Sequence, residues 1–245
     1  MKCRIRTDLH IHSALSPCGD EFMTPGNIVG MGVVNGLDAL AVTDHNSSYN
    51  VPAAIEIAEE YGILLVPGME LETSEEIHIV CLFPGYRELE AFQGDVCRSY
   101  SPRENRTDIF GCQRIYNGRD EITGEWKPML LQPTGISIET VFQLADGYGG
   151  IAYPAHVDRD SYSVLSSFGM LPYGYPHRFV EISCQCCPEQ LRRQYPQLEA
   201  YQLLRASDAH YPDQIQEEGT VLTVQEKSAA GIIEALKNGG ISVEK

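Results

Sequence analysis

Short apolar runs alternate along this chain with stretches of helical periodicity. Strand-like runs occupy residues 4–9, 37–42, 62–67, 77–83, 150–153, 178–183, 203–207 and 220–224. Apolar residues at helical spacing predict helices at about 25–35, 51–61, 138–145 and 229–237. Strands that alternate with helices in this way predict an α/β fold with a parallel sheet, either open or closed into a barrel.

Residues 85–135 interrupt this alternation. The segment is polar and contains the turn-forming pairs Asn117-Gly118 and Thr123-Gly124. A structureless loop of this length would be unusual in a compact domain, so we expect an ordered insertion near the mouth of the barrel. The chain length suits one large domain, and we expect a single domain over 1–245 that carries this insertion.

The chain is acidic, with a formal net charge of −16. A protein that grips nucleic acid through a broad surface is usually basic, so we expect no large nucleic-acid surface. A small anionic substrate stays compatible with this charge, because bound divalent cations invert the local field of a site.

The N-terminal sequence is charged between Lys2 and Asp8 and lacks the apolar core of a signal peptide. No apolar run approaches the roughly 20 residues that a membrane span needs. The eight cysteines are then most simply reduced thiols, and Cys184, Cys186 and Cys187 lack the spacing of a zinc knuckle. We therefore expect a cytoplasmic protein without a membrane partner.

Six of the seven histidines lie at or near the ends of the strand-like runs. His10 and His12 stand two apart on an extended run, so their side chains point to the same face. Barrel enzymes assemble their active sites at the C-terminal ends of their strands, and imidazole is the commonest metal ligand. The pattern predicts a metal site at that edge of the sheet. The other four histidines are His45, His78, His156 and His210, of which His78 would reach the site from within its strand.

Six motifs in this order resemble the polymerase and histidinol phosphatase (PHP) superfamily. They are Asp8-Leu9-His10-Ile11-His12-Ser13, Thr43-Asp44-His45-Asn46, Pro67-Gly68-Met69-Glu70, Ile77-His78-Ile79, Pro154-Ala155-His156 and Ser207-Asp208-Ala209-His210. The resemblance covers nearly the whole chain apart from 85–135. It implies a distorted (β/α)7 barrel of TIM-like form, with a metal cluster, usually trinuclear, at its C-terminal mouth. It also implies hydrolysis of phosphoesters.

Carried over motif by motif, the resemblance implies overlapping sets of metal ligands. The first two sets share Glu70 as a bridge between two ions. They are His10, His12, Glu70 and Asp208 for the first ion, and Glu70, His78 and His156 for the second.

A third ion would be bound by His45, His210 and a residue of the first loop. The family often has Ser-Asp-Gly in this loop, whereas the loop here reads Ser-Pro-Cys-Gly-Asp-Glu over residues 16–21. Asp20 is the best candidate for this ligand by its distance along the chain from Thr24-Pro25, the pair that follows the loop. Glu21 and Cys18 are the alternatives.

These donor types are consistent with two to three divalent ions of manganese, zinc or iron. A bridging carboxylate would hold two ions about 3.5–4 Å apart, as in two-metal phosphoesterases. The nucleophile would then be a metal-bound water rather than a protein side chain.

Three carboxylates lie beside the predicted ligands. Asp8 is expected to orient an imidazole rather than to bind metal, and the same two roles are open to Asp44. Glu72 shares the strand face of Glu70 but is the weaker candidate, since it can equally be exposed.

Arg159 follows His156 by three residues, so it should lie on the loop that leaves the mouth of the barrel. A guanidinium there would clamp a phosphate, and the competing interpretation is an ion pair with a nearby carboxylate. Arg178 and Lys127 are weaker candidates for the phosphate contact. His177 stands outside the metal set and is either a substrate contact or a surface residue before a strand.

The sequence thus predicts a metal-dependent phosphoesterase, a phosphatase or a phosphodiesterase, that acts on a small phosphorylated metabolite or a nucleotide. One alternative is a PHP-like module that binds metal or ligand without catalysis, which would be expected to lack some ligands. Another is an amidohydrolase-like hydrolase of C–N bonds. That class commonly uses a carboxylated lysine as its bridge, and no lysine ends a candidate strand here.

Overall fold

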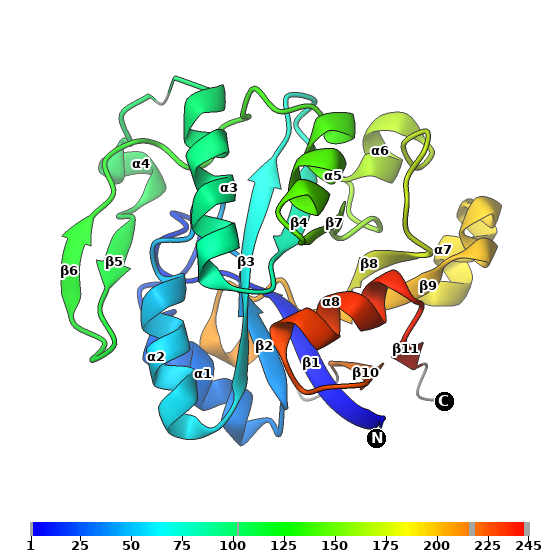
Figure 1. Ribbon diagram of the computed structural model, residues 1–245. Coiled ribbons are helices and arrows are strands. Elements are labelled where there is room, and N and C mark those ends of the chain that lie inside the picture. Colours follow the sequence, from blue (N-terminus) through cyan, green and yellow to red (C-terminus); the bar gives the residue numbers. More distant parts are fainter. Residues whose placement is uncertain (1, 102, 216–218, 243–245) are drawn as a thin grey trace.

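The computed structural model describes residues 2–101, 103–215 and 219–242. A curled sheet of seven strands forms its centre (Figure 1). The strands are β1 (Cys3–Ile11), β2 (Ala39–Val42), β3 (Leu64–Glu72), β4 (His78–Leu82), β7 (Ile151–Pro154), β10 (Thr220–Val224) and β11 (Ile241–Ser242). Their order across the sheet is β11-β10-β1-β2-β3-β4-β7.

The direction of β4 decides which residues share an edge of this sheet. β1, β2 and β3 pair in parallel, but β4 runs antiparallel to β3 and β7, and β10 runs antiparallel to β1. The expectation of a wholly parallel sheet is therefore wrong. Only residues 73–77 join β3 to β4, and so short a connection forms a hairpin rather than the crossover that parallel neighbours need. As a result β4 begins where β3 ends, with His78 opposite Glu72.

A second, parallel pair of strands, β8 (Phe179–Ser183) and β9 (Gln202–Ala206), stands beside the main sheet. A side-chain contact, rather than a ladder of backbone hydrogen bonds, links β9 to β10. The Thr220 hydroxyl accepts from the backbone N–H of Arg205 at 2.7 Å and donates to its carbonyl at 2.9 Å. The result is an α/β fold with a distorted, incompletely hydrogen-bonded barrel, which confirms the predicted fold class.

Alternate strand residues face two different apolar clusters. In β2, Leu40 and Val42 pack in a cluster that also holds residues of the surrounding helices, whereas Ala39 and Ala41 join a cluster that includes residues of the C-terminal helix. The period of two in a strand explains this division. The helices are α1 (Pro25–Val34), α2 (Val51–Tyr61), α5 (Ile138–Gly147), α6 (Val164–Phe168), α7 (Pro188–Gln194) and α8 (Ala229–Lys237), with 3₁₀ turns at Pro196–Ala200 and Pro212–Gln214.

Hydroxyl side chains fix where three of these helices begin. Thr24, Ser137 and Ser228 each accept a hydrogen bond from the backbone N–H three residues on, at the N-termini of α1, α5 and α8. No helix of the described residues is long and apolar enough to cross a membrane.

The segment 85–135 divides into two parts. Its first part is α3 (Tyr86–Ser99), which buries Leu89, Phe92 and Val96 in the main apolar cluster. Its second part holds α4 (Thr107–Phe110) and a hairpin of β5 (Arg114–Tyr116) and β6 (Ile122–Glu125), which projects at one side of the molecule beside α2 (Figure 1). That the segment is an insertion within a single domain stays a prediction.

Candidate metal centre

Six histidines and two carboxylates gather where the barrel strands end. β1 carries His10 and leads into His12, and β3 carries Glu70. His78 reaches the same edge because the antiparallel β4 begins there. The remaining members lie just beyond β2, β7 and β9, and they are His45, His156, Asp208 and His210.

The carboxylate of Glu70 is the centre of this cluster. Its side chain is buried, and its oxygens lie 2.9–3.3 Å from ring nitrogens of five histidines, namely His10, His12, His45, His78 and His156. These approaches do not have hydrogen-bond geometry. Both Glu70 oxygens and the Nδ1 atoms of His45 and His156 have no hydrogen-bond partner among the described residues. Buried polar atoms without partners are rare, so their concentration here fits a site for a bound cation.

Asp208 forms a second group of donors with His10 and His12. Its Oδ1 lies 3.1 Å from Nε2 of His12 and 3.4 Å from Nε2 of His10, and the two Nε2 atoms are 3.2 Å apart. His45, Glu70 and His78 form another such group, with donor atoms within 4.8 Å of one another. Imidazole and carboxylate donors suit zinc, iron and manganese ions, so the residues present fit such metals.

The electrostatics of the cluster favour cations. Burial opposes ionisation of Glu70, but His78, His10 and His45 hold the pKa of its carboxyl well below the usual range. Burial also disfavours a charged His10, yet Glu181 and then Glu70 raise the pKa of that ring well above its ordinary value. Burial lowers the pKa of His78 to about 4. The cluster therefore places an ionised carboxylate among imidazole nitrogens, which is a donor set for divalent ions.

Buried partners hold the rings of His10 and His12 at Nδ1, while Nε2 of each ring faces Glu70. Nδ1 of His10 lies 2.8 Å from Oε1 of Glu181 in β8. Nδ1 of His12 lies 3.0 Å from Oγ of Ser16, which donates in turn to Asp44 at 2.6 Å. Such partners fix the tautomer and the orientation of a ring.

Glu181 is the functional candidate that the sequence argument missed. The available signal was a glutamate in the middle of the apolar run Phe179–Ser183. A charged side chain is almost never fully buried unless it is paired, and Glu181 is buried against His10.

Asp8, Asp44 and Glu72 lie near the cluster but outside its groups of ligating atoms among the described residues. Asp44 accepts hydrogen bonds from the backbone and the hydroxyls of Ser13 and Ser16 at 2.6–3.2 Å. Asp8 accepts from the backbone N–H of Ser207 at 3.1 Å, and burial raises the pKa of its carboxyl to about 6. Burial likewise raises the pKa of Glu72 to about 7. Asp8 and Asp44 thus fix the loops that carry the histidines.

The first loop places a thiol, and not a carboxylate, among the donors. The ligating atoms of His12, Cys18, His45 and His210 lie within 4.8 Å of one another. Although desolvation opposes a thiolate, His45 and then His210 lower the pKa of the Cys18 thiol to about 5. The structure does not bring the predicted Asp20 into this group.

Arg159 and His177 have different positions relative to the cluster. Nη2 of Arg159 lies 3.0 Å from Oδ2 of Asp208, and its side chain is 47% exposed at the rim. His177 precedes β8 and therefore lies at the opposite end of that strand from the cluster. It lines a hollow of about 580 Å³ with Tyr173 and Lys237. The structure thus brings Arg159 to the site but not His177.

The backbone is strained at the loops that form the site. Asn46, His156 and Asp208 have φ angles of 49°, 28° and 50°, in the left-handed region that side chains other than glycine rarely adopt. Such conformations cost about 1–3 kcal/mol each and persist where the surroundings enforce them, often at functional sites. They turn the chain just after β2, β7 and β9, where ligand candidates leave the strands.

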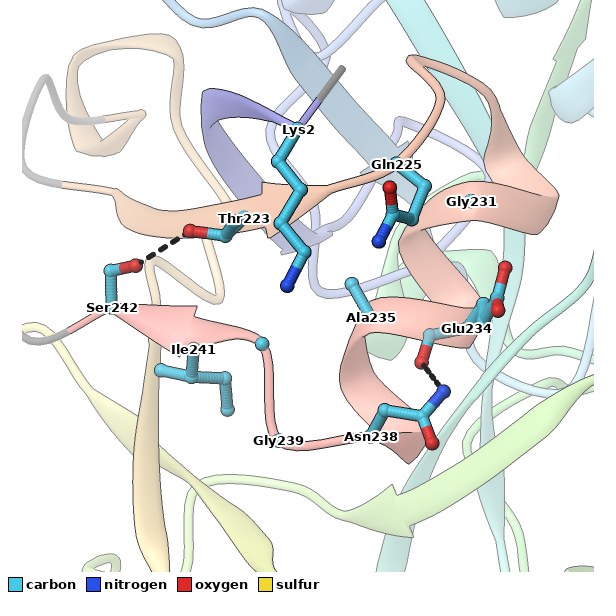
Figure 2. Close-up of a pocket in the computed structure, with 11 residues that line it drawn as sticks. Lys2, Thr223, Gln225, Gly231, Glu234, Ala235, Asn238, Gly239, Ile241 and Ser242 are labelled. Carbon is cyan, nitrogen blue, oxygen red and sulfur yellow. Dashed lines mark hydrogen bonds between the residues drawn. The ribbon is translucent and has the colours of Figure 1, made fainter.

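A hollow elsewhere on the molecule lacks comparable chemistry. It has a volume of about 410 Å³ and lies among β10, β11 and α8 (Figure 2). Lys2 and Glu234 are its charged lining residues, and none of the cluster residues contributes to it. The candidate site is therefore the histidine cluster.

Comparisons with known proteins identify a family model that matches part of the chain. The sequence model of the PHP domain family matches residues 8–132, about half of the chain. Phosphoribosyl 1,2-cyclic phosphate 1,2-diphosphodiesterase of Eggerthella lenta is 27% identical over 123 residues, which are 48% of this chain and 45% of that protein. The 5'-3' exoribonuclease Rnm of Salmonella typhimurium is 39% identical over 80 residues, or 31% of this chain and 26% of that protein. The chain thus matches less than half the length of either relative.

The crystal structure of the lesion-specific endonuclease PfuEndoQ from Pyrococcus furiosus has a similar fold. The TM-score is 0.69 at 17% sequence identity, and the match covers 97% of this chain and 57% of that one. At this identity the likeness concerns the fold alone.

Proposed function

This chain belongs to the PHP domain family, and from that membership we propose that it hydrolyses phosphoester bonds with the help of divalent metal ions. The observation that carries the proposal is the convergence of five histidines on the buried Glu70. We propose a small phosphorylated metabolite or a short nucleotide as the substrate. Hydrolysis of a phosphodiester is the first reaction to test, because both named relatives act on such bonds.

The residues that would hold metal fall into three overlapping sets. Glu70 would be common to the first two, since its two oxygens face different histidines. Ions bound there would activate water for attack on phosphorus and neutralise charge on the phosphate oxygens. The sets are His10, His12, Glu70 and Asp208; Glu70, His78 and His156; and a third that includes His45 and His210.

The chain's own contribution is to hold these donors rigid and to bind the substrate. Glu181 and Ser16 orient the rings of His10 and His12. Arg159 lies at the rim, where its guanidinium can bind a phosphate oxygen while it contacts Asp208.

A cleft of about 470 Å³ beside the cluster offers room for a small substrate. Cys18, Arg114 and Tyr211 line it, together with Asp20 and Glu21. Its volume falls within the roughly 300–1,000 Å³ of typical ligand pockets. The net charge of −16 argues against a long nucleic acid as the substrate but not against a short nucleotide.

The proposal is tested by reconstituting metal-free protein with manganese, zinc or iron. We expect hydrolysis of at least one member of a panel that contains p-nitrophenyl phosphate, bis(p-nitrophenyl) phosphate, a cyclic nucleotide and a dinucleotide. Metal-replete protein that binds its ions but cleaves none of these would favour the alternative of a binding module.

The alternative, an amidohydrolase-like hydrolase of C–N bonds, commonly uses a carboxylated lysine as its bridge. Among the described lysines, Lys127, Lys227 and Lys237 pair with acidic residues away from the cluster. Lys2 points into the remote hollow (Figure 2). Glu70 is instead the proposed bridge, which supports phosphoester hydrolysis over this alternative.

Glu181→Gln should weaken metal binding or turnover about 10- to 100-fold, as is usual when a partner of a metal-binding histidine is replaced. The amide keeps the size of the side chain but loses the charge that faces Nδ1 of His10. Metal titration and steady-state kinetics measure the effect. Glu189→Gln, at an exposed glutamate of α7, is the matched control. Unchanged metal affinity and turnover in Glu181→Gln would assign Glu181 a packing role only.

Arg159→Ala should lower kcat/KM for phosphoesters about 10- to 100-fold, because a lost charge-assisted contact costs about 1.5–3 kcal/mol. Metal content should stay constant, and Arg159→Lys should recover part of the loss because it keeps the charge but not the fork. Arg178, the weaker candidate for this contact, precedes β8 and so lies at the end of that strand away from the cluster, and Arg178→Ala at this exposed position is the control. A fall in metal content instead would show that Arg159 acts by positioning Asp208.

A further inference from the structure

We propose that Cys18 is a thiolate ligand of a third metal ion, which it binds with His45 and His210 beside His12. The inference rests on the proposed metal-dependent function and extends it. It assigns to this position a preference for zinc, iron or cobalt ions over manganese and magnesium. It also replaces Asp20, the ligand that the sequence favoured.

The geometry of the cluster is the first support. The ligating atoms of the four residues lie within 4.8 Å of one another. The ring centroid of His12 lies 4.5 Å from that of His45 and 4.3 Å from that of His210. With His12 assigned to the first ion, two imidazoles and one thiol supply three protein ligands, the number found where a metal keeps one position open.

The free nitrogens of the histidines are the second support. Nδ1 of His210 donates to the backbone carbonyl of Asp208 at 2.8 Å, which leaves the lone pair on Nε2 available. His45 is buried, and its Nδ1 lies 2.9 Å from Oε2 of Glu70, which leaves Nε2 as the nitrogen for the group that contains Cys18. In each ring, one nitrogen is thus left for a ligand at this position.

The first loop makes a tight turn at the position of the thiol. The backbone N–H of Gly19 donates to the carbonyl of Ser16 at 2.8 Å, and a Cβ at Gly19 would lie 2.5 Å from the carbonyl oxygen of Ser13. This close approach requires glycine and makes a tight turn at residues 16–19. The loop presents Cys18 to His45 and His210 at this turn.

The two acidic residues of the loop are engaged elsewhere. Oδ1 of Asp20 accepts from the backbone N–H of Phe22 at 2.9 Å, and Oε2 of Glu21 pairs with Arg114 at 3.0 Å. Both hold the loop in place. A conservative Asp20→Asn variant can keep the turn while removing the charge.

A thiolate changes the metal preference of the position. Soft sulfur donors favour zinc and similar transition metals, whereas carboxylate and water suit magnesium and manganese. The groups around Glu70 and Asp208 contain only nitrogen and oxygen donors among the described residues. The cluster would then be asymmetric, with its sulfur-containing position next to the cleft that Cys18 also lines.

Titration of the metal-free protein with Co²⁺ tests the proposal without measuring activity. A thiolate bound to Co²⁺ gives a charge-transfer band in the near ultraviolet, which imidazole and carboxylate ligands do not give. We expect this band in the wild-type protein and its loss in Cys18→Ser, with one fewer Co²⁺ bound per chain. Asp20→Asn should keep the band, and so should Cys112→Ser, at an exposed cysteine that lines the same cleft.

Two results would overturn the proposal. One is Co²⁺ binding by the wild-type protein without the band. The other is loss of one ion in Asp20→Asn while Cys18→Ser binds the full number. Because the band reports a bond and not a rate, its presence in a protein that cleaves no phosphoester would contradict the proposed function alone. Its absence in an active, metal-replete protein would contradict the cysteine ligand alone.

Discussion

Glu70→Gln is expected to remove bound metal and turnover together. The amide keeps the size of the side chain but loses the charge that lies among five imidazoles at 2.9–3.3 Å. Replacing an outer partner of a metal site typically costs about 10- to 100-fold, so a ligand common to two sets should cost more than about 100-fold in kcat/KM. Elemental analysis and phosphoester kinetics on the same preparation measure both effects.

Glu72→Gln is the matched control for that variant. Glu72 lies on the same strand face as Glu70 and is also buried, but it stands outside the groups of ligating atoms. We expect its metal content to stay near that of the wild-type protein. Near-normal turnover in Glu70→Gln together with metal loss in Glu72→Gln would move the bridge to Glu72.

Removal of the metal ions should abolish turnover and destabilise the fold. In the metal-free cluster, five imidazoles surround one buried carboxylate whose oxygens lack hydrogen-bond partners among the described residues. A ligand that binds only the native state contributes about 2.7 kcal/mol at a hundred times its Kd, so each tightly held ion should raise the unfolding midpoint measurably. Chelation followed by a thermal melt and an activity assay measures both losses.

Re-addition of manganese, zinc or iron should restore both properties, with more than one ion bound per chain. Glu70→Gln provides the control, since its melting temperature should respond less to added metal. A wild-type protein that takes up no transition metal even after reconstitution would remove the basis of the proposed function.

The positions of most strands and helices followed from local pattern. Apolar runs such as Ala39–Val42 bury residues on both sides, so their continuous hydrophobicity was readable without tertiary information. The direction of β4 was not readable in the same way. It depended on the extension of β3 to Glu72, which leaves only residues 73–77 before β4, whereas the strand predicted from periodicity ends at residue 67.

The histidines of the site were identifiable from the sequence because a common metal-binding residue recurs at the ends of strand-like runs. His10 and His12 lie two apart at the end of β1, His45, His156 and His210 follow strands that end at the same edge, and His78 begins β4 there. Their individual partners could not be inferred in this way. Glu181 is separated from His10 by 171 residues, and only the tertiary fold brings their side chains to 2.8 Å.

The sequence by itself determined the fold class, the edge of the barrel that carries the chemistry and most of the residue types present there. These follow from strand periodicity and from the short distance along the chain between each strand and its polar residue. Only the tertiary structure decided which neighbours meet. It brought the thiol of Cys18, and not the carboxylate of Asp20, close to ring nitrogens of His45 and His210, although the backbone of Asp20 also contacts His210. It also separated His177 from the cluster, since the start and the end of β8 lie at opposite ends of the barrel.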